Sequence, residues 1–208
     1  MQCEAPDTHF YADIRDFNLE FLGLVASARH AGQGCLLGLD SGVVQQVSRL
    51  PALQLQAMAT IPCLLAAFGV GSRTGLRVAE PPPGEDPRWV ERLRLFTTGL
   101  LTYLWQMSRS DALRVALVLG PTAPPHAPEA PMRDIRNHAE QAARHLEARF
   151  RTSPRFWPDL VRAARDGQPQ RLHLARLTAI QLASAEKPRW QGCRAPALSV
   201  TSRSAVTR

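Results

Sequence analysis

The sequence predicts an all-α protein with a helical N-terminal body and a C-terminal helical extension. In the longest segments, apolar residues recur at three- and four-residue spacing, which is the spacing of one helical face. Clusters of glycine and proline divide the chain into runs of helical length. Hydrophobic residues make up 45% of the 208 residues, which is ordinary for a globular protein with a buried core.

The first predicted helix covers residues 13–30, with Asp13 as its N-cap and Asp16 in the first turn, where a carboxylate is favourable. Its apolar residues occupy most of the girth of the helix rather than one narrow stripe. A helix of this kind is usually buried on more than one side. In a chain of this length, we expect a second subunit to supply part of that burial.

Three glycines between residues 32 and 38 end this helix. A new cap at Asp40 or Ser41 starts a short helix, and Pro51 marks the turn to a further helix over residues 52–60. The two short helices superficially resemble a DNA-reading helix-turn-helix. The second helix carries no arginine or lysine to reach a phosphate or a guanine. We therefore interpret it as a packing or partner-contact element.

Residues 63–68 are a short apolar run that we expect to be buried. The longest helical pattern follows over residues 86–120, with Asp86 as its cap and Pro87 as its first residue. The arginines of this pattern are Arg88, Arg92, Arg94, Arg109 and Arg114. Arginines on one helix can contact phosphates, and they are also what any solvated helix face carries.

Five prolines in residues 121–131 predict a semi-rigid, extended linker. Beyond the linker, apolar periodicity predicts a helix over residues 132–151 and two further helices over residues 155–165 and 171–185, which can form a helical hairpin. The segment 186–208 is poor in core-forming residues, and we expect it to be a disordered basic tail.

The net charge of +7 is unevenly distributed along the chain. Residues 1–120, the expected body, hold 10 arginines and 11 acidic residues. Residues 121–208 hold 15 basic and seven acidic residues, so their net charge is +8. A basic extension can attract nucleic-acid phosphates through counterion release, or it can be a solvated segment. Charge alone favours neither alternative.

The polar residues do not predict catalysis or metal binding. His138 and His145 are seven residues apart, whereas a helical zinc pair needs a spacing of four. The four cysteines form no CxxC pair, and we expect them to be reduced packing residues. No GxSxG nucleophile elbow occurs. We therefore expect no enzyme, no metal and no cofactor.

The sequence also predicts a cytoplasmic protein without membrane contact. No run approaches the ~18 uninterrupted apolar residues that a membrane-spanning helix needs. The N-terminal segment carries acidic residues where a signal peptide carries basic ones.

A set of residues spread over positions 13–118 has the order and spacing of a known family. These residues are Asp16, Asn18, Leu19, Leu22, Leu37, Gly38, Leu39, Asp40, Leu50, Gln54, Ala59, Phe68, Val90, Leu93, Thr98, Gly99 and Leu100. In this pattern the chain resembles FlhD, the flagellar master transcriptional regulator, a small all-helical bacterial protein. The match covers slightly more than half of the chain.

The resemblance implies an intertwined helical homodimer that binds a zinc-containing partner, FlhC. In that family, the hetero-oligomer binds promoter DNA of flagellar genes and activates transcription, and the partner supplies much of the DNA affinity. The implied dimer interface consists of Phe17, Leu19, Phe21, Leu22, Leu24, Val25, Leu37, Leu39 and Phe68. The family's DNA-contacting segment corresponds to residues 88–98 of this chain. The predicted DNA-contacting residues are Arg88, Arg92, Arg94, Thr97 and Thr98, together with Arg109 and Arg114 further along the same helical pattern.

Three features depart from the family pattern, and one of them is a loop between Arg29 and Leu36 that is shorter than usual. Ala66 stands where the family often has a cysteine that can cross-link the dimer, and Cys63 is offset by three residues. The basic segment from residue 131 onward has no counterpart in the typical family member.

From the resemblance, the predicted function is a transcriptional regulator of flagellar-type genes that acts with an FlhC-like partner. The alternative is a helical adaptor that binds other regulatory proteins without contacting DNA.

Overall fold

The structure is a computed structural model, and it describes residues 7–28, 37–68, 86–110, 139–140 and 142–186. These residues form a mainly helical protein with one two-stranded sheet. The predicted helical class is therefore confirmed at that level. Predictions for residues 111–138 and 187–208, which include the proline-rich linker and the basic tail, lie outside the described residues.

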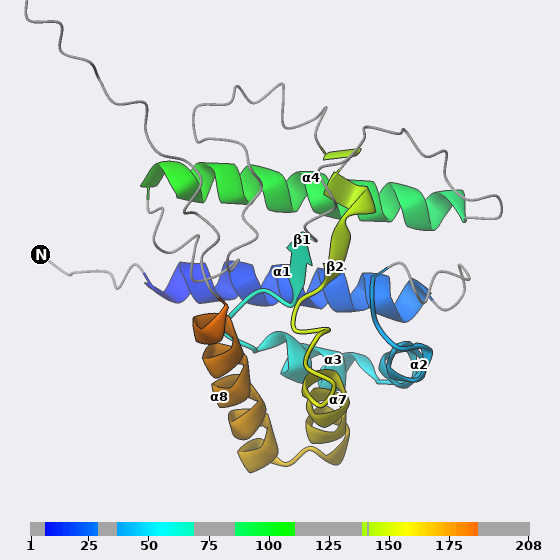
Figure 1. The fold of residues 1–208 in the computed structure, drawn as a ribbon, viewed down its shortest axis with the longest axis vertical. Helices are drawn as coiled ribbons and strands as arrows, with labels where there is room; N and C mark the ends of the chain where they lie inside the picture. Colours follow the sequence, from blue (N-terminus) through cyan, green and yellow to red (C-terminus); the bar gives the residue numbers. More distant parts are fainter. Residues whose placement is uncertain (1–6, 29–36, 69–85, 111–138, 141, 187–208) are drawn as a thin grey trace, which may run out of the picture.

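The central element is α1 (Asp7–Ala28). One side of it is covered by α4 (Pro87–Ser110), and the other side by α2 (Ser41–Ser48) and α3 (Ala52–Ala59) (Figure 1). All three of these helices contact α1. The apolar girth of this helix is thus buried on two sides by its own chain.

The helices α1 and α4 run antiparallel (Figure 1). Near the start of α4, the indole N–H of Trp89 donates to the carbonyl oxygen of Leu24, near the end of α1, at 3.2 Å. Toward the opposite end of the pair, the ring centroids of Phe17 and Tyr103 lie 5.0 Å apart. These contacts fix the register of the two helices relative to each other.

The start of two helices follows the predicted capping. The Oδ1 atom of Asp40 accepts a hydrogen bond of 2.7 Å from the backbone N–H of Gly42, which confirms Asp40 as the N-cap of α2. The Oδ1 atom of Asp86 accepts a hydrogen bond of 2.9 Å from the backbone N–H of Arg88 at the start of α4. Both carboxylates bind N–H groups that have no partner within the helix.

A small sheet joins the two halves of the chain. The strand β1 (Ala66–Phe68) pairs antiparallel with β2 (Leu146–Ala148), with Ala66 opposite Ala148. Next to the pair, the backbone N–H of Arg149 donates to the carbonyl oxygen of Leu65 at 2.7 Å. All of residues 63–68 are buried, so the predicted burial of this run is confirmed.

The predicted helical hairpin is present as α7 (Phe156–Asp166) and α8 (Pro169–Ala185). Gly167 ends α7 with φ of 62°, a left-handed conformation that glycine adopts without strain. Pro169 is the first residue of α8, where its missing N–H costs nothing. The hairpin packs against the short helices, with α7 in contact with both α2 and α3 (Figure 1).

One hydrophobic cluster extends from α4 through α1 to α7. Phe21 of α1 packs against Phe96 of α4, with ring centroids 6.0 Å apart, and against Trp157 of α7 at 6.5 Å. The indole N–H of Trp157 donates to the carbonyl oxygen of Arg149 at 2.9 Å. The described part of the C-terminal extension therefore shares its core with the N-terminal helices.

The predicted N-cap of the first helix is wrong. The helix already includes Asp7, so Asp13 lies inside it, almost two turns from its start. The turn before residue 13 is helical because Phe10 packs against the hydrophobic core and meets the ring of Tyr11 at 5.4 Å. Burial of an apolar side chain extends the helix beyond the polar residue that sequence alone suggests as its cap.

The predicted helix over residues 132–151 is wrong in its last part. Residues 139–140 and 142–144 are helical, whereas Leu146–Ala148 form β2. Phe150 has φ of 62°, which ends any regular helix there. Pairing with β1 and burial of Leu146 in the core outweigh the helix propensity of this sequence.

Candidate protein-binding groove

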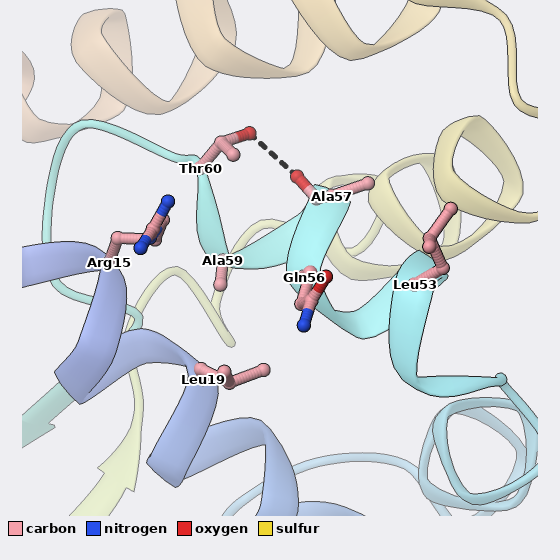
Figure 2. Close-up of a pocket in the computed structure, with 7 residues that line it drawn as sticks. All are labelled: Arg15, Leu19, Leu53, Gln56, Ala57, Ala59 and Thr60. Carbon is pink, nitrogen blue, oxygen red and sulfur yellow. Dashed lines mark hydrogen bonds between the residues drawn. The ribbon is translucent and has the colours of Figure 1, made fainter. Parts of the chain in front are cut away.

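A shallow groove of about 380 Å³ lies between α1 and α3. Two of its lining residues come from α1, and the others come from α3 and the residue that follows it (Figure 2). The lining residues are Arg15, Leu19, Leu53, Gln56, Ala57, Ala59 and Thr60.

Helical spacing brings these side chains to one surface. Arg15 and Leu19 are one turn apart on α1, and Leu53, Gln56 and Thr60 recur on one face of α3. The opposite face of each helix is used for the core, where residues such as Ile14 and Met58 are completely buried. The groove is therefore built from the outer edges of two helices whose inner faces pack together.

Leu53 is the most unusual residue of the groove. Its side chain is 78% exposed, which is the largest exposure among the large hydrophobic residues that the structure describes. The neighbouring Gln54 is anchored, because its Nε2 donates to the carbonyl oxygen of Arg165 at 3.2 Å. This contact between α3 and α7 holds the helix that presents Leu53 to solvent.

Arg15 gives the groove a positive charge. Among the described residues it pairs with the carboxylate of Asp16, at 3.6 Å, and both side chains are more than half exposed. An ion pair of this kind in solvent contributes little, so the guanidinium remains available to a further anion. The Thr60 hydroxyl, which also lines the groove, donates to the carbonyl oxygen of Ala57 and accepts a hydrogen bond of 2.7 Å from Arg176 of α8.

The groove suits binding rather than proton transfer. Its walls are aliphatic side chains, and its polar groups are one guanidinium, one amide and one hydroxyl. Apolar anchors beside one cation fit a helical or extended peptide that carries apolar side chains and a carboxylate.

Three of the five arginines predicted to contact DNA, Arg88, Arg92 and Arg94, lie on the first half of α4 and are exposed. One of them, Arg92, donates from Nη1 to the Ser27 hydroxyl of α1 at 3.3 Å. Another, Arg94, forms an exposed ion pair with Glu140 at 3.3 Å. Arg88 is exposed next to the start of the helix. The three guanidinium groups thus lie on one helix but differ in their partners.

The other residues of the predicted DNA-contacting set are placed differently. Thr97 is buried, and its hydroxyl donates to the carbonyl oxygen of Leu93 at 2.8 Å, so in this structure it faces the core. Thr98 is half-buried and donates to the carbonyl oxygen of Arg94. Arg114 and the side chain of Arg109 lie outside the described residues.

Most residues of the predicted dimer interface are buried within one chain. Seven of the nine are buried, and the other two, Phe17 and Leu19, are half-buried. Phe17 packs edge-on against Phe96 of α4 at 6.2 Å between ring centroids, and Leu19 lines the groove. We expected a second subunit because apolar residues occupy most of the girth of α1. In the structure, other helices of the same chain cover these residues.

Cys63 is buried beside the ion pair of Arg149 and Glu186. Burial raises the pKa of the Cys63 thiol to about 11, and the positive charge of Arg149 opposes this while the carboxylate of Glu186 adds to it. The thiol is therefore protonated at neutral pH and behaves as a packing residue. The other three cysteines lie outside the described residues.

The groove was not predicted from the sequence. Leu53 lies in the run Leu-Gln-Leu-Gln, in which Leu55 packs against the core and Leu53 does not. Leu53 can be recognised as an exposed apolar residue only once it is known which face of α3 is buried.

The chain was compared with protein-family models, with curated proteins and with solved structures, and none of them matches it. Within the described residues, no group of three or more histidine, cysteine or acidic side chains is placed to hold a metal ion. A search of the same residues finds no helix with the length and apolar character that crossing a bilayer requires.

Proposed function

We propose that this chain is a helical adaptor that regulates a partner protein by binding it in the groove between α1 and α3. The carrying observation is the largely exposed Leu53, which lines the same groove as Leu19 and Arg15 (Figure 2). An exposed leucine in a rimmed apolar groove is typical of a binding surface. The proposed site of action is the cytoplasm.

The partner that fits best is an amphipathic segment with two apolar anchors and a carboxylate. The anchors would cover Leu19 and Leu53, and the carboxylate would bind Arg15, whose ion-pair partner among the described residues, Asp16, is exposed. The ion pair between Arg15 and the partner's carboxylate at the groove rim should orient the partner and raise the association rate more than it raises the affinity.

Site-specific photo-crosslinking in the native cell tests this proposal. Benzoylphenylalanine at position 53 should cross-link one predominant protein, whereas the same group at Leu95, an exposed leucine of α4, should not. With the captured partner purified, Leu53→Asp and Arg15→Glu should each weaken binding at least ~10-fold, because each removes an interface anchor. Leu95→Asp is the matched control. Equal losses from positions 53 and 95 would contradict the groove as the binding site.

A second candidate function is supported by the arginines of α4. Arg88, Arg92 and Arg94 are exposed on one helix, and the sequence beyond residue 120 adds a net charge of +8. These charges support a FlhD-like transcriptional co-activator of flagellar-type genes, acting as an intertwined homodimer with an FlhC-like partner. In this alternative, promoter DNA is bound mainly through the partner complex.

DNA binding in the presence of an FlhC-like protein tests the second candidate. Neutralising Arg88 and Arg92 with glutamine should lower the affinity uniformly across sequences and reduce the salt slope by about two. The variant Arg162→Gln, on an exposed position of α7, is the control. Salt-independent binding, or no association with the FlhC-like protein, would exclude this function.

A further inference from the structure

Helix α8 is apolar on two opposite faces. Its inner face uses small residues, with Ala175 and Ala179 buried against the core. Its outer face carries Leu174, Leu177 and Ile180, whose exposed fractions are 61%, 44% and 47%. We call these three residues the outer stripe. Three large aliphatic side chains in a row on one helix are more than the scattered exposure that is normal for a surface.

The hydroxyl groups on the exposed side of α8 can be buried in an interface at little desolvation cost. The Thr178 hydroxyl donates to the carbonyl oxygen of Leu174 at 2.9 Å, and the Ser184 hydroxyl donates to that of Ile180 at 2.8 Å. These two donors are satisfied inside the helix, so burying them leaves neither hydroxyl hydrogen unpaired.

The arginines of α8 are also engaged with this chain. The Nη1 atom of Arg171 lies 2.6 Å from the Oδ2 atom of Asp166, and Arg176 donates to Thr60 at the end of the neighbouring helix. The remaining ionisable residue of the helix, His173, is exposed. The outer stripe therefore contains no charged side chain, which is the composition of an interface core rather than of a nucleic-acid surface.

The outer stripe is symmetric about the middle of the helix. α8 has 17 residues, and Leu177 is its central residue. Leu174 and Ile180 flank Leu177 by three residues on either side. When two copies of such a helix pack antiparallel across a two-fold axis at Leu177, Leu174 of each copy meets Ile180 of the other. A self-complementary arrangement of this kind is what an isologous contact requires.

We infer that a second copy of this chain docks on the outer stripe, with α8 packed antiparallel against α8 of the partner. The chain carries a net charge of +7, and contact through an uncharged face avoids placing like charges together. A 17-residue helix is about 25 Å long, so the contact is smaller than a standard interface of roughly 800 Å² per partner. The dimer should therefore be weak, so its population should depend on the protein concentration. The groove lies on α1 and α3, so this inference is independent of the proposed adaptor function.

Sedimentation equilibrium of the full chain over a wide concentration range tests the inference. The wild type should show a monomer–dimer equilibrium. Leu177→Glu places two carboxylates at the two-fold axis and should leave only monomer, whereas Leu95→Glu on α4 should behave as wild type. Circular dichroism and the thermal midpoint show that each variant is folded.

A charge-swap experiment tests the antiparallel register. Leu174→Lys and Ile180→Glu should each weaken the dimer when introduced alone, because each buries a charge. Combined in one chain, they should restore it, since the new lysine of one copy would then face the new glutamate of the other in both halves of the contact. A monomer at all concentrations, or a dimer unaffected by Leu177→Glu, would overturn the inference. Failure of the double variant to recover would overturn the antiparallel arrangement.

Discussion

The side-chain oxygen of Asn18 accepts a hydrogen bond of 2.8 Å from the backbone N–H of Leu65, inside the core. The amide nitrogen of the same side chain donates to the carbonyl oxygens of Ala59, Ile61 and Cys63, at 3.0 to 3.3 Å. One asparagine on α1 thus satisfies the backbone of the segment that leads from α3 to β1. Without it, these buried polar groups would lose this partner.

Replacing Asn18 with leucine should destabilise the protein strongly. The side chain keeps a similar volume, but the buried N–H of Leu65 and the carbonyl oxygens lose their partner, so we expect a cost of about 3 kcal/mol. Urea denaturation followed by circular dichroism measures this change. Gln45→Leu, on the exposed surface of α2, should change the stability by less than about 0.5 kcal/mol. Similar losses for the two variants would argue against the role given to Asn18.

The ion pair of Arg149 with Glu186 should contribute more than a surface pair. The side chain of Arg149 is only 1% exposed, and its Nη2 lies 2.7 Å from the Oε2 atom of Glu186. Glu186→Gln removes a charged partner of a buried guanidinium and should cost about 2–3 kcal/mol.

The matched control for this ion pair is Glu147→Gln. Glu147 pairs at 2.8 Å with Arg151, whose side chain is 43% exposed, so its loss should cost less than about 1 kcal/mol. The free energies of unfolding of both variants at neutral pH are compared. Equal effects would show that burial does not strengthen the Arg149 pair.

The stability of the protein should fall in alkaline solution because of Cys63. The pKa of this thiol is raised from 9.0 to about 11 in the folded protein. Between these values, the unfolded chain releases its proton and the folded chain retains it, so stability decreases as the pH rises from about 9 to 11. The full effect is about 2–3 kcal/mol.

The variant Cys63→Ala isolates this contribution. The difference in unfolding free energy between wild type and Cys63→Ala should shrink by that amount between about pH 8 and about pH 11, because only the wild type carries the buried thiol. Parallel stability curves for the two proteins would contradict the assignment.

Removal of residues 131–208 should abolish cooperative folding. The truncated chain lacks β2, and it also lacks Trp157, which packs on Phe21 in the middle of the core. Loss of this cover exposes α1 and α3 to water, so we expect a broad thermal transition and increased dye binding typical of a loosely packed state. Truncation after Glu186 keeps all described elements and is the control. A sharp transition in the shorter chain would show that residues 1–130 fold alone.

Local sequence signals predicted the local parts of this fold. Asp40 and Asp86 cap the helices that they were expected to cap, and Gly167 separates α7 from α8 at the predicted break. These features depend on a few neighbouring residues. Their physical causes, a free N–H group or a positive φ, are therefore visible in the sequence.

The features that sequence did not predict depend on distant residues. Leu146 belongs to a strand because β1 lies beside it, and Asn18 is buried because the segment after α3 brings four backbone groups to it. The apolar girth of α1 was correctly interpreted as burial on more than one side. The sequence could not show that the covering surfaces come from α2, α3 and α4 of the same chain.

The candidate groove shares this dependence on tertiary structure. Arg15 and Leu53 are far apart in the sequence, and they line one surface only because α1 and α3 pack together. The arginines of α4 were visible as a set, but the burial of Thr97 among them was not. The sequence is enough to identify the arginines of α4, whereas tertiary packing determines which polar residues of α4 are exposed to solvent.

The pairing of β1 with β2 also has a consequence for synthesis of the protein. Residue 66 leaves the ribosome long before its partner at residue 148, and α7 follows later still. At about 5–20 residues per second, the interval of ~80 residues lasts roughly 4–16 s. During this time the nascent chain exposes the apolar sides of α1 and α3 that α7 later covers. The yield of native protein in a cell should therefore depend on chaperones that bind the emerging chain.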